Sequence, residues 1–170
     1  MTLVEWGALG ELIGGIAIIG SLIYVGVQVK DSARATRSAA TNDASGAMQS
    51  WYQEMGSNRQ ASEVWLNAIT SSDPLSTHDE FQFIMMMHAI IYAMQNSYLL
   101  TQEGTLDADY RDAISSIVLG VKDLPSWDRY WRQRRGLLHC GFAEYVDGLL
   151  LQDSIKTLDV YERSENAPDN

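Results

Sequence analysis

An apolar run near the amino terminus constrains the fold of this chain more than any other feature of its sequence. Residues 8–29 (ALGELIGGIAIIGSLIYVGVQV) carry one charged side chain, Glu11. A helix of about 22 residues is roughly 33 Å long, which matches a bilayer hydrocarbon core of about 30 Å. Its Leu, Ile and Val side chains favour insertion by about 3 to 6 kcal/mol in total. Glu11 lies one turn from the end of the run, where its cost is small. We expect residues 1–30 to form a transmembrane anchor.

Two other interpretations of the apolar run stay open. The core helix of a soluble protein is also apolar, although a protein of this size rarely needs a helix that is apolar on every face. A cleaved signal peptide begins with positive charge, and no Lys or Arg precedes the run. A retained spanning helix fits both observations better.

The residues that flank the run predict its orientation. Lys30, Arg34 and Arg37 follow it directly. The positive-inside rule then places the amino terminus outside and the rest of the chain in the cytoplasm. Trp6 and Tyr24 lie near the two ends, where aromatic side chains meet the membrane interface. The three basic residues share one helix face, which favours contact with anionic lipid headgroups.

Small residues recur along one face of the same helix. Gly10, Gly14, Ala17 and Ser21 follow the spacing i, i+4, i+7 and i+11. Such a face lets two helix backbones approach closely in lipid. It predicts a helix partner, either a second copy of the chain or another membrane subunit. Incidental small residues are the alternative, because Gly is frequent in spanning helices.

Composition excludes several classes of function. The 170-residue chain has 12 basic and 22 acidic residues, so its formal charge of −10 opposes nucleic-acid binding. A single cysteine, Cys140, excludes an internal disulfide. No Glu-x-x-His, Gly-x-Ser-x-Gly, P-loop or His-Glu-x-x-His motif occurs. We expect no catalytic residue, no metal and no cofactor, and therefore no enzyme.

The remainder of the chain has helical periodicity and no alternating strand of convincing length. It predicts an all-α fold, in which residues 31–161 form a small antiparallel helical bundle in the cytoplasm. Residues 162–170 are polar and predict a flexible tail. The expected helix boundaries are Gly56-Ser57-Asn58, the loop Ser71 to Pro74, a cap at Thr77, a stop at Gly104, a cap at Asp107, Leu124-Pro125, and Gly136 or Gly141.

The helix between Thr77 and Gly104 is the expected centre of the bundle. His88 lies on its apolar face and is interpreted as a core histidine rather than a base or ligand. The residues expected to face the core are Phe81, Ile84, Met85, His88, Ile91, Tyr92, Gln95, Tyr98 and Leu99.

Arginines alternate with aromatic residues in the segment 124–136 (LPSWDRYWRQRRG). This pattern favours cation–π contacts and ion pairs with the acidic surface of the same body. Contact with a partner protein or with lipid is the other interpretation. The residues that would make it are Trp127, Arg129, Trp131, Arg132 and Arg135.

Four segments of the sequence resemble a group of uncharacterised bacterial proteins of similar size. These proteins have an N-terminal membrane anchor of the type WEAIGAIGEIVGAIAVVVSLIYL and a helical cytoplasmic body that ends in a YVD-like segment. The resemblance implies the same organisation in a bacterial inner membrane. The resemblance implies no activity, so it assigns no catalytic residue to this chain. Leu138 stands near the position at which the group has a Phe, which is a departure from the group's pattern. The segments are residues 2–39, SEVWLNAI, the helix that contains Phe81, and residues 124–150.

Together these patterns predict a non-catalytic accessory or scaffold subunit of a larger inner-membrane complex. Its partners would be membrane lipid and either other membrane subunits or a second copy, and not nucleic acid. The alternative is a membrane-tethered sensor or defence effector. In that case the body would bind a small ligand around His88 and the run Met85-Met86-Met87.

Overall fold

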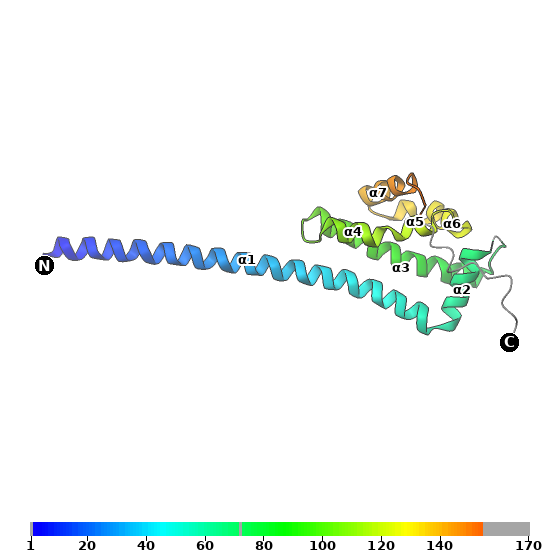
Figure 1. Ribbon diagram of the computed structural model, residues 1–170, viewed down its shortest axis with the longest axis horizontal. Helices are drawn as coiled ribbons and strands as arrows, with labels where there is room; N and C mark the ends of the chain where they lie inside the picture. Colours follow the sequence, from blue (N-terminus) through cyan, green and yellow to red (C-terminus); the bar gives the residue numbers. More distant parts are fainter. Residues whose placement is uncertain (1, 72, 155–170) are drawn as a thin grey trace. The chain divides into compact units, whose positions relative to one another are not determined.

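The computed structural model describes residues 2–71 and 73–154, with Glu5 and Leu9 described by their backbone alone (Figure 1). Helices make up 85% of the structure, and these ranges contain no strand. The predicted all-α class is thus confirmed. The predicted tail, residues 162–170, lies outside the described residues. The chain divides into two compact units, Met1–Ala39 and Ala40–Asn170.

Seven α-helices and one 3-10 turn occur in the described part of the chain. They are α1 (Leu3–Ser57), α2 (Arg59–Thr70), α3 (Thr77–Gln102), α4 (Ala108–Ser115), α5 (Ile117–Val121), α6 (Pro125–Arg134), η1 (Arg135–Leu137) and α7 (Cys140–Leu150).

The first unit consists of the amino-terminal part of α1. An 18-residue window of this helix has a mean hydropathy of 2.1, and none of its residues is buried. A core helix of a soluble protein buries its apolar stripe. By length and composition, α1 is long and apolar enough to cross a membrane.

The second unit has one hydrophobic core, to which α1 contributes Ala44 and Met48. In this unit α3 packs against α2, α4, α6 and α7, while α5 packs against α7. The largest fully buried apolar and aromatic side chains come from four helices, which shows that the core joins segments far apart in the sequence. They include Phe83, Met87, Ile91 and Met94 of α3, Val118 of α5, Tyr130 of α6, and Phe142 and Val146 of α7.

Side-chain caps fix the amino-terminal ends of three helices, α2, α3 and α4. Asn58 accepts a hydrogen bond from the Ala61 amide at 3.2 Å, and Asp107 accepts one from the Asp109 amide at 2.8 Å. The cap of α3 is Ser76, one residue before the expected Thr77, and it accepts from the Asp79 amide at 3.2 Å. These caps begin the helices that follow the loops that the sequence indicated.

Two further boundaries depend on single residues. The chain leaves α3 at Gly104, whose φ of +74° is readily adopted only by glycine. The single helix expected after Asp107 is divided into α4 and α5 at Ser116. Its hydroxyl donates to the Ala113 carbonyl oxygen at 2.7 Å, which competes with regular helix hydrogen bonding.

The buried face of α3 agrees with the expected one only in part, because Ile84 and Ile91 are buried as expected and other expected residues are not. Phe81 is 62% exposed and Tyr92 is 48% exposed, although both were expected in the core. The buried positions instead include Phe83, Met87 and Ile90. The side chains of α3 itself are apolar on every side of the helix. Their spacing in the sequence therefore does not show which side packs against the core.

Candidate functional site

The small-residue face of α1 is open in the described structure. Gly10, Gly14, Ala17 and Ser21 are all exposed. A Cβ added at Gly10 or Gly14 would meet no described atom within 4 Å. The Ser21 hydroxyl donates to the Ala17 carbonyl oxygen at 2.9 Å, so the helix itself satisfies this polar group. The face therefore has room for a second helix backbone.

Exposed aromatic and basic side chains lie at the ends of the apolar run. Trp6 is 60% exposed and Tyr24 is 63% exposed. The Tyr24 hydroxyl accepts a hydrogen bond from Gln28 Nε2 at 3.0 Å. This arrangement leaves both rings available to a membrane interface. The basic residues Lys30, Arg34 and Arg37 are exposed as well.

The segment rich in arginine and tryptophan packs its rings inward. Trp127 and Trp131 are buried, and their rings stack with centroids 5.4 Å apart. Trp131 Nε1 donates to Asp147 Oδ1 at 3.0 Å, and Arg135 Nε donates to Asp147 Oδ2 at 3.0 Å. The Arg135 hydrogen bond lowers the pKa of Asp147. These contacts tie α6 and η1 to α7.

The other two arginines of the predicted contact, Arg129 and Arg132, differ in exposure. Arg132 forms an ion pair with Asp128 at 2.6 Å, and both side chains are largely exposed. Arg129 is half-buried. Of the five residues in this prediction, the arginines alone present charged surface to a partner.

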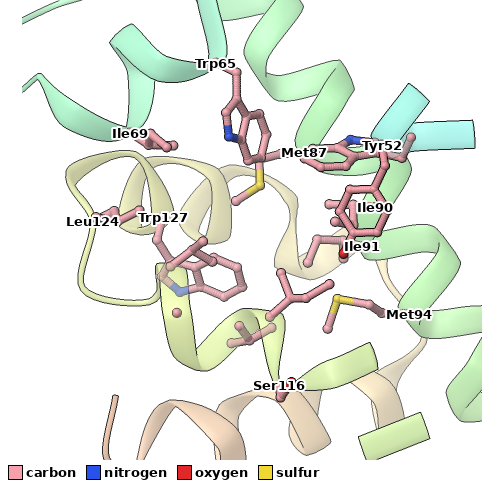
Figure 2. A pocket seen from close by; sticks show the side chains of 15 residues that line it. Tyr52, Trp65, Ile69, Met87, Ile90, Ile91, Met94, Ser116, Leu124 and Trp127 are labelled. Atoms are coloured by element: carbon pink, nitrogen blue, oxygen red, sulfur yellow. The ribbon is translucent and has the colours of Figure 1, made fainter. Parts of the chain in front are cut away.

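A cavity of about 340 Å³ lies within the second unit (Figure 2). Its wall is almost wholly apolar and aromatic, and no Asp, Glu, Lys or Arg lines it. Tyr52, at 54% exposed, is the most exposed of its wall residues, and the others are buried or half-buried. The wall comprises Trp51 and Tyr52 of α1, Trp65 and Ile69 of α2, Met87, Ile90, Ile91 and Met94 of α3, Ser116, Ile117, Val118, Gly120, Val121, Leu124, and Trp127 of α6.

Three tryptophans from three helices form much of this wall. Trp51 and Trp65 meet edge to face with centroids 4.9 Å apart, and Trp51 Nε1 donates to the Met86 carbonyl oxygen at 3.1 Å. The Trp127 indole nitrogen is buried and has no hydrogen-bond partner among the described residues. Burying an N–H group without a partner costs about 1–3 kcal/mol. Trp127 thus lines the cavity while its indole nitrogen is an unsatisfied donor buried in the protein.

His88 lies outside this cavity. Its Nδ1 is 2.8 Å from the Tyr130 hydroxyl. Burial lowers the pKa of His88, and the charge of Arg134 adds to the effect. Met87 lines the cavity, whereas Met85, Met86 and His88 do not. The cavity is therefore displaced from the position that the sequence suggested for a ligand.

The groups with potential reactivity are dispersed. Cys140 is exposed and its Sγ donates to Glu144 Oε1 at 3.5 Å. The neighbouring His139 uses its backbone amide to donate to Gln95 Oε1 at 2.7 Å. Within residues 2–71 and 73–154, no group of His, Cys, Asp or Glu side chains is arranged to hold a metal ion.

Comparison with known proteins gives no match to a family model, a curated protein or a solved structure. The function must therefore be argued from the residues of this chain. Sequence reasoning missed the cavity, because its wall joins residues from distant helices. The one available signal was the occurrence of Trp51, Trp65 and Trp127 on three separate expected helices.

Proposed function

We propose that this protein is a single-pass membrane protein that serves as a non-catalytic accessory or scaffold subunit of a larger complex in a bacterial inner membrane. One observation carries the proposal: a strongly apolar window of α1 has none of its residues buried. Ile16 is 64% exposed and Leu22 is 66% exposed. Each such side chain left in water forgoes about 1.5–3 kcal/mol. A bilayer and a partner helix would cover this surface.

The small-residue face supports the choice of a helix as partner. Close approach of backbones is the main source of packing between helices in lipid. Gly10 and Gly14 leave that approach open. The partner is a second copy of this chain or another membrane subunit.

The orientation follows from the charges. Lys30, Arg34 and Arg37 would lie on the cytoplasmic side, so the amino terminus would lie outside. The body would be a bundle with antiparallel neighbouring helices, as short loops favour. Its acidic surface would be repelled by anionic lipid, and the basic residues would form the contact with the headgroups.

The native cysteine tests this topology without any substitution. Cys140 is exposed and is the only cysteine in the chain. We expect a membrane-impermeant maleimide to leave it unlabelled in spheroplasts and to label it after lysis. The protein should also stay in the membrane pellet after a carbonate wash. Labelling in intact spheroplasts contradicts the orientation, and release by carbonate contradicts the anchor.

A matched pair of variants tests the assembly. Gly14→Ile places a bulky side chain on the small-residue face, whereas Gly15→Ile places it about 100° around the helix. Neither substitution meets a neighbour in the described chain at its Cβ. After extraction in mild detergent, we expect Gly14→Ile to lose the co-eluting chain and Gly15→Ile to retain it. A wild-type protein that elutes as a lone monomer from native membranes argues against the scaffold role.

A second candidate function rests on the cavity. A membrane-tethered sensor needs a site for a small ligand in its body, and small-molecule sites have typical volumes of about 300–1,000 Å³. The cavity of about 340 Å³ meets this requirement. If the protein is such a sensor, filling the cavity should change the assembly state of the chain. Ligand binding that leaves the assembly unchanged argues against this candidate.

A further inference from the structure

We propose that the cavity in the second unit binds one uncharged, flat molecule of hydrocarbon character, about the size of two fused rings, through apolar and aromatic contacts alone. The inference specifies the ligand class of the sensor candidate and rests on that candidate for its role in the cell. It does not depend on the assembly proposed for the membrane span.

The chemistry of the wall determines the polarity of the ligand. Among the described residues, no acidic or basic side chain lines the cavity, so a charged group there would lose its hydration and gain no partner. The Ser116 hydroxyl already donates to the Ala113 carbonyl oxygen at 2.7 Å. Trp51 Nε1 already donates to the Met86 carbonyl oxygen at 3.1 Å. The Trp127 indole nitrogen has almost no accessible surface, so it offers no contact to a ligand. The wall therefore selects a ligand by its apolar surface.

The volume of the cavity sets the size of the ligand. It is about 340 Å³. An apolar cavity of about 150 Å³ in another protein stays dry and binds benzene. A space more than twice as large has room for a molecule of about two rings. Water is a poor alternative occupant, because a buried water needs about two to four polar partners.

Aromatic side chains from three helices determine the shape of the ligand. Trp51 of α1, Trp65 of α2 and Trp127 of α6 all line the cavity. Figure 2 shows the rings of Trp65 and Trp127 beside the Met87 side chain at the same space. Aromatic rings prefer partners that stack with an offset or meet them edge to face. A flat ring system can make such contacts, whereas an alkyl chain cannot.

Much of the wall is ordered before any ligand arrives. The Trp51 ring is held by its hydrogen bond to Met86 and by its edge-to-face contact with Trp65. Trp65 in turn packs against Phe83, with centroids 5.5 Å apart. A rigid site spends little of its binding free energy on ordering side chains. The flexible thioether of Met94 can fill whatever gap a ligand leaves.

Azulene and azulene-1-carboxylate test the proposal on the full-length protein in mild detergent. Azulene is a flat two-ring hydrocarbon whose absorption overlaps tryptophan emission, and the carboxylate adds one negative charge to the same ring system. The partition of each probe into protein-free micelles is measured first, so that affinities refer to the free probe. We expect azulene to quench tryptophan fluorescence saturably. We expect the carboxylate to bind at least tenfold more weakly, because the wall gives its charge no partner.

Two variants that fill the cavity identify the site. Ile117 and Val121 are half-buried residues of the wall. Ile117→Phe and Val121→Phe each place a ring in the space and should weaken azulene binding at least tenfold. Leu66→Phe, at an exposed position outside the wall, is the matched control and should leave the affinity unchanged. Circular dichroism establishes that each variant retains its helices, and either filling variant that does so is sufficient for the test.

The outcomes separate this inference from the sensor candidate. Equal or tighter binding of the carboxylate overturns the ligand class and leaves a ligand site for a sensor. Azulene quenching that is not saturable, or that the filling variants leave intact, overturns the site itself. Saturable binding of azulene with an unchanged assembly state supports this inference and argues against the sensor. None of these results bears on whether α1 has a helix partner.

Discussion

The two units of the chain differ in how far their apolar side chains are exposed. In the first, Ile16 and Leu22 are more than half exposed, and the most apolar window of α1 buries none of its residues. In the second, Phe83, Phe142 and Val146 are fully buried. The hydrophobic effect acts on both, so apolar surroundings such as the proposed bilayer or partner helix would stabilise the first unit. The comparison teaches that similar apolar residues form a buried core in one unit and, in the function proposed above, a membrane span in the other.

The largest effect should come from truncating the core of the second unit. Phe142 is fully buried, so Phe142→Ala should lower the free energy of unfolding by about 3–5 kcal/mol through lost transfer energy and a new cavity. Chemical denaturation of the full-length protein in mild detergent, followed by circular dichroism, measures this. Ile16→Ala in the first unit is the matched control, and the stability of the body should not change. A comparable loss in both variants would contradict the division of the chain into an anchor and a core.

A charge in the middle of the apolar run should have the next largest effect. Ile19 is 59% exposed, and Ile19→Lys should disfavour insertion by about 3 kcal/mol because the ammonium group would lie near the bilayer centre. The fraction of protein in carbonate-washed membranes measures the loss. Leu66→Lys, at an exposed position in the body, should leave that fraction unchanged. Full retention of Ile19→Lys in the membrane would show that the run does not span it.

The coarse organisation was predictable because local sequence determines it. Each of its signals affects only the few residues next to it in the chain. These signals are the apolar run, the cap at Asp107 and the glycine stop at Gly104. The all-α class and the end of α1 follow from such signals. The buried residues of α2 were also predictable, because Ala61, Val64, Ala68 and Ile69 recur at helical spacing on one face.

What the sequence did not predict depends on tertiary packing. α3 is apolar all round, so its neighbours decide that Phe83 rather than Phe81 is buried. The cavity requires Trp51, Trp65 and Trp127 to converge from three helices. The unpaired indole N–H of Trp127 is a further consequence of that packing, since every tryptophan looks alike in a sequence.

A smaller effect on stability is expected from Asp147, whose carboxylate joins α6 and η1 to α7. Hydrogen bonding from Arg135 lowers the pKa of Asp147 in the folded state. The resulting stability is present above the unfolded pKa and is lost as the pH falls through the folded pKa. The side chain of Asp147 is 41% exposed, so solvent screening should limit the contribution to less than about 1 kcal/mol.

Asp147→Asn isolates this contribution, because the amide oxygen still accepts from Trp131 while the charge is removed. We expect the variant to be slightly less stable at neutral pH and to lose less stability than the wild type between about pH 5 and 3. Thermal unfolding across that range measures the difference. Asp128→Asn is the matched control, since the ion pair of Asp128 with Arg132 is largely exposed and should contribute little. Asp147 lies in the second unit, so Asp147→Asn should leave the fraction of protein in carbonate-washed membranes unchanged. A loss of the variant from the membrane would contradict the assignment of the proposed span to the first unit.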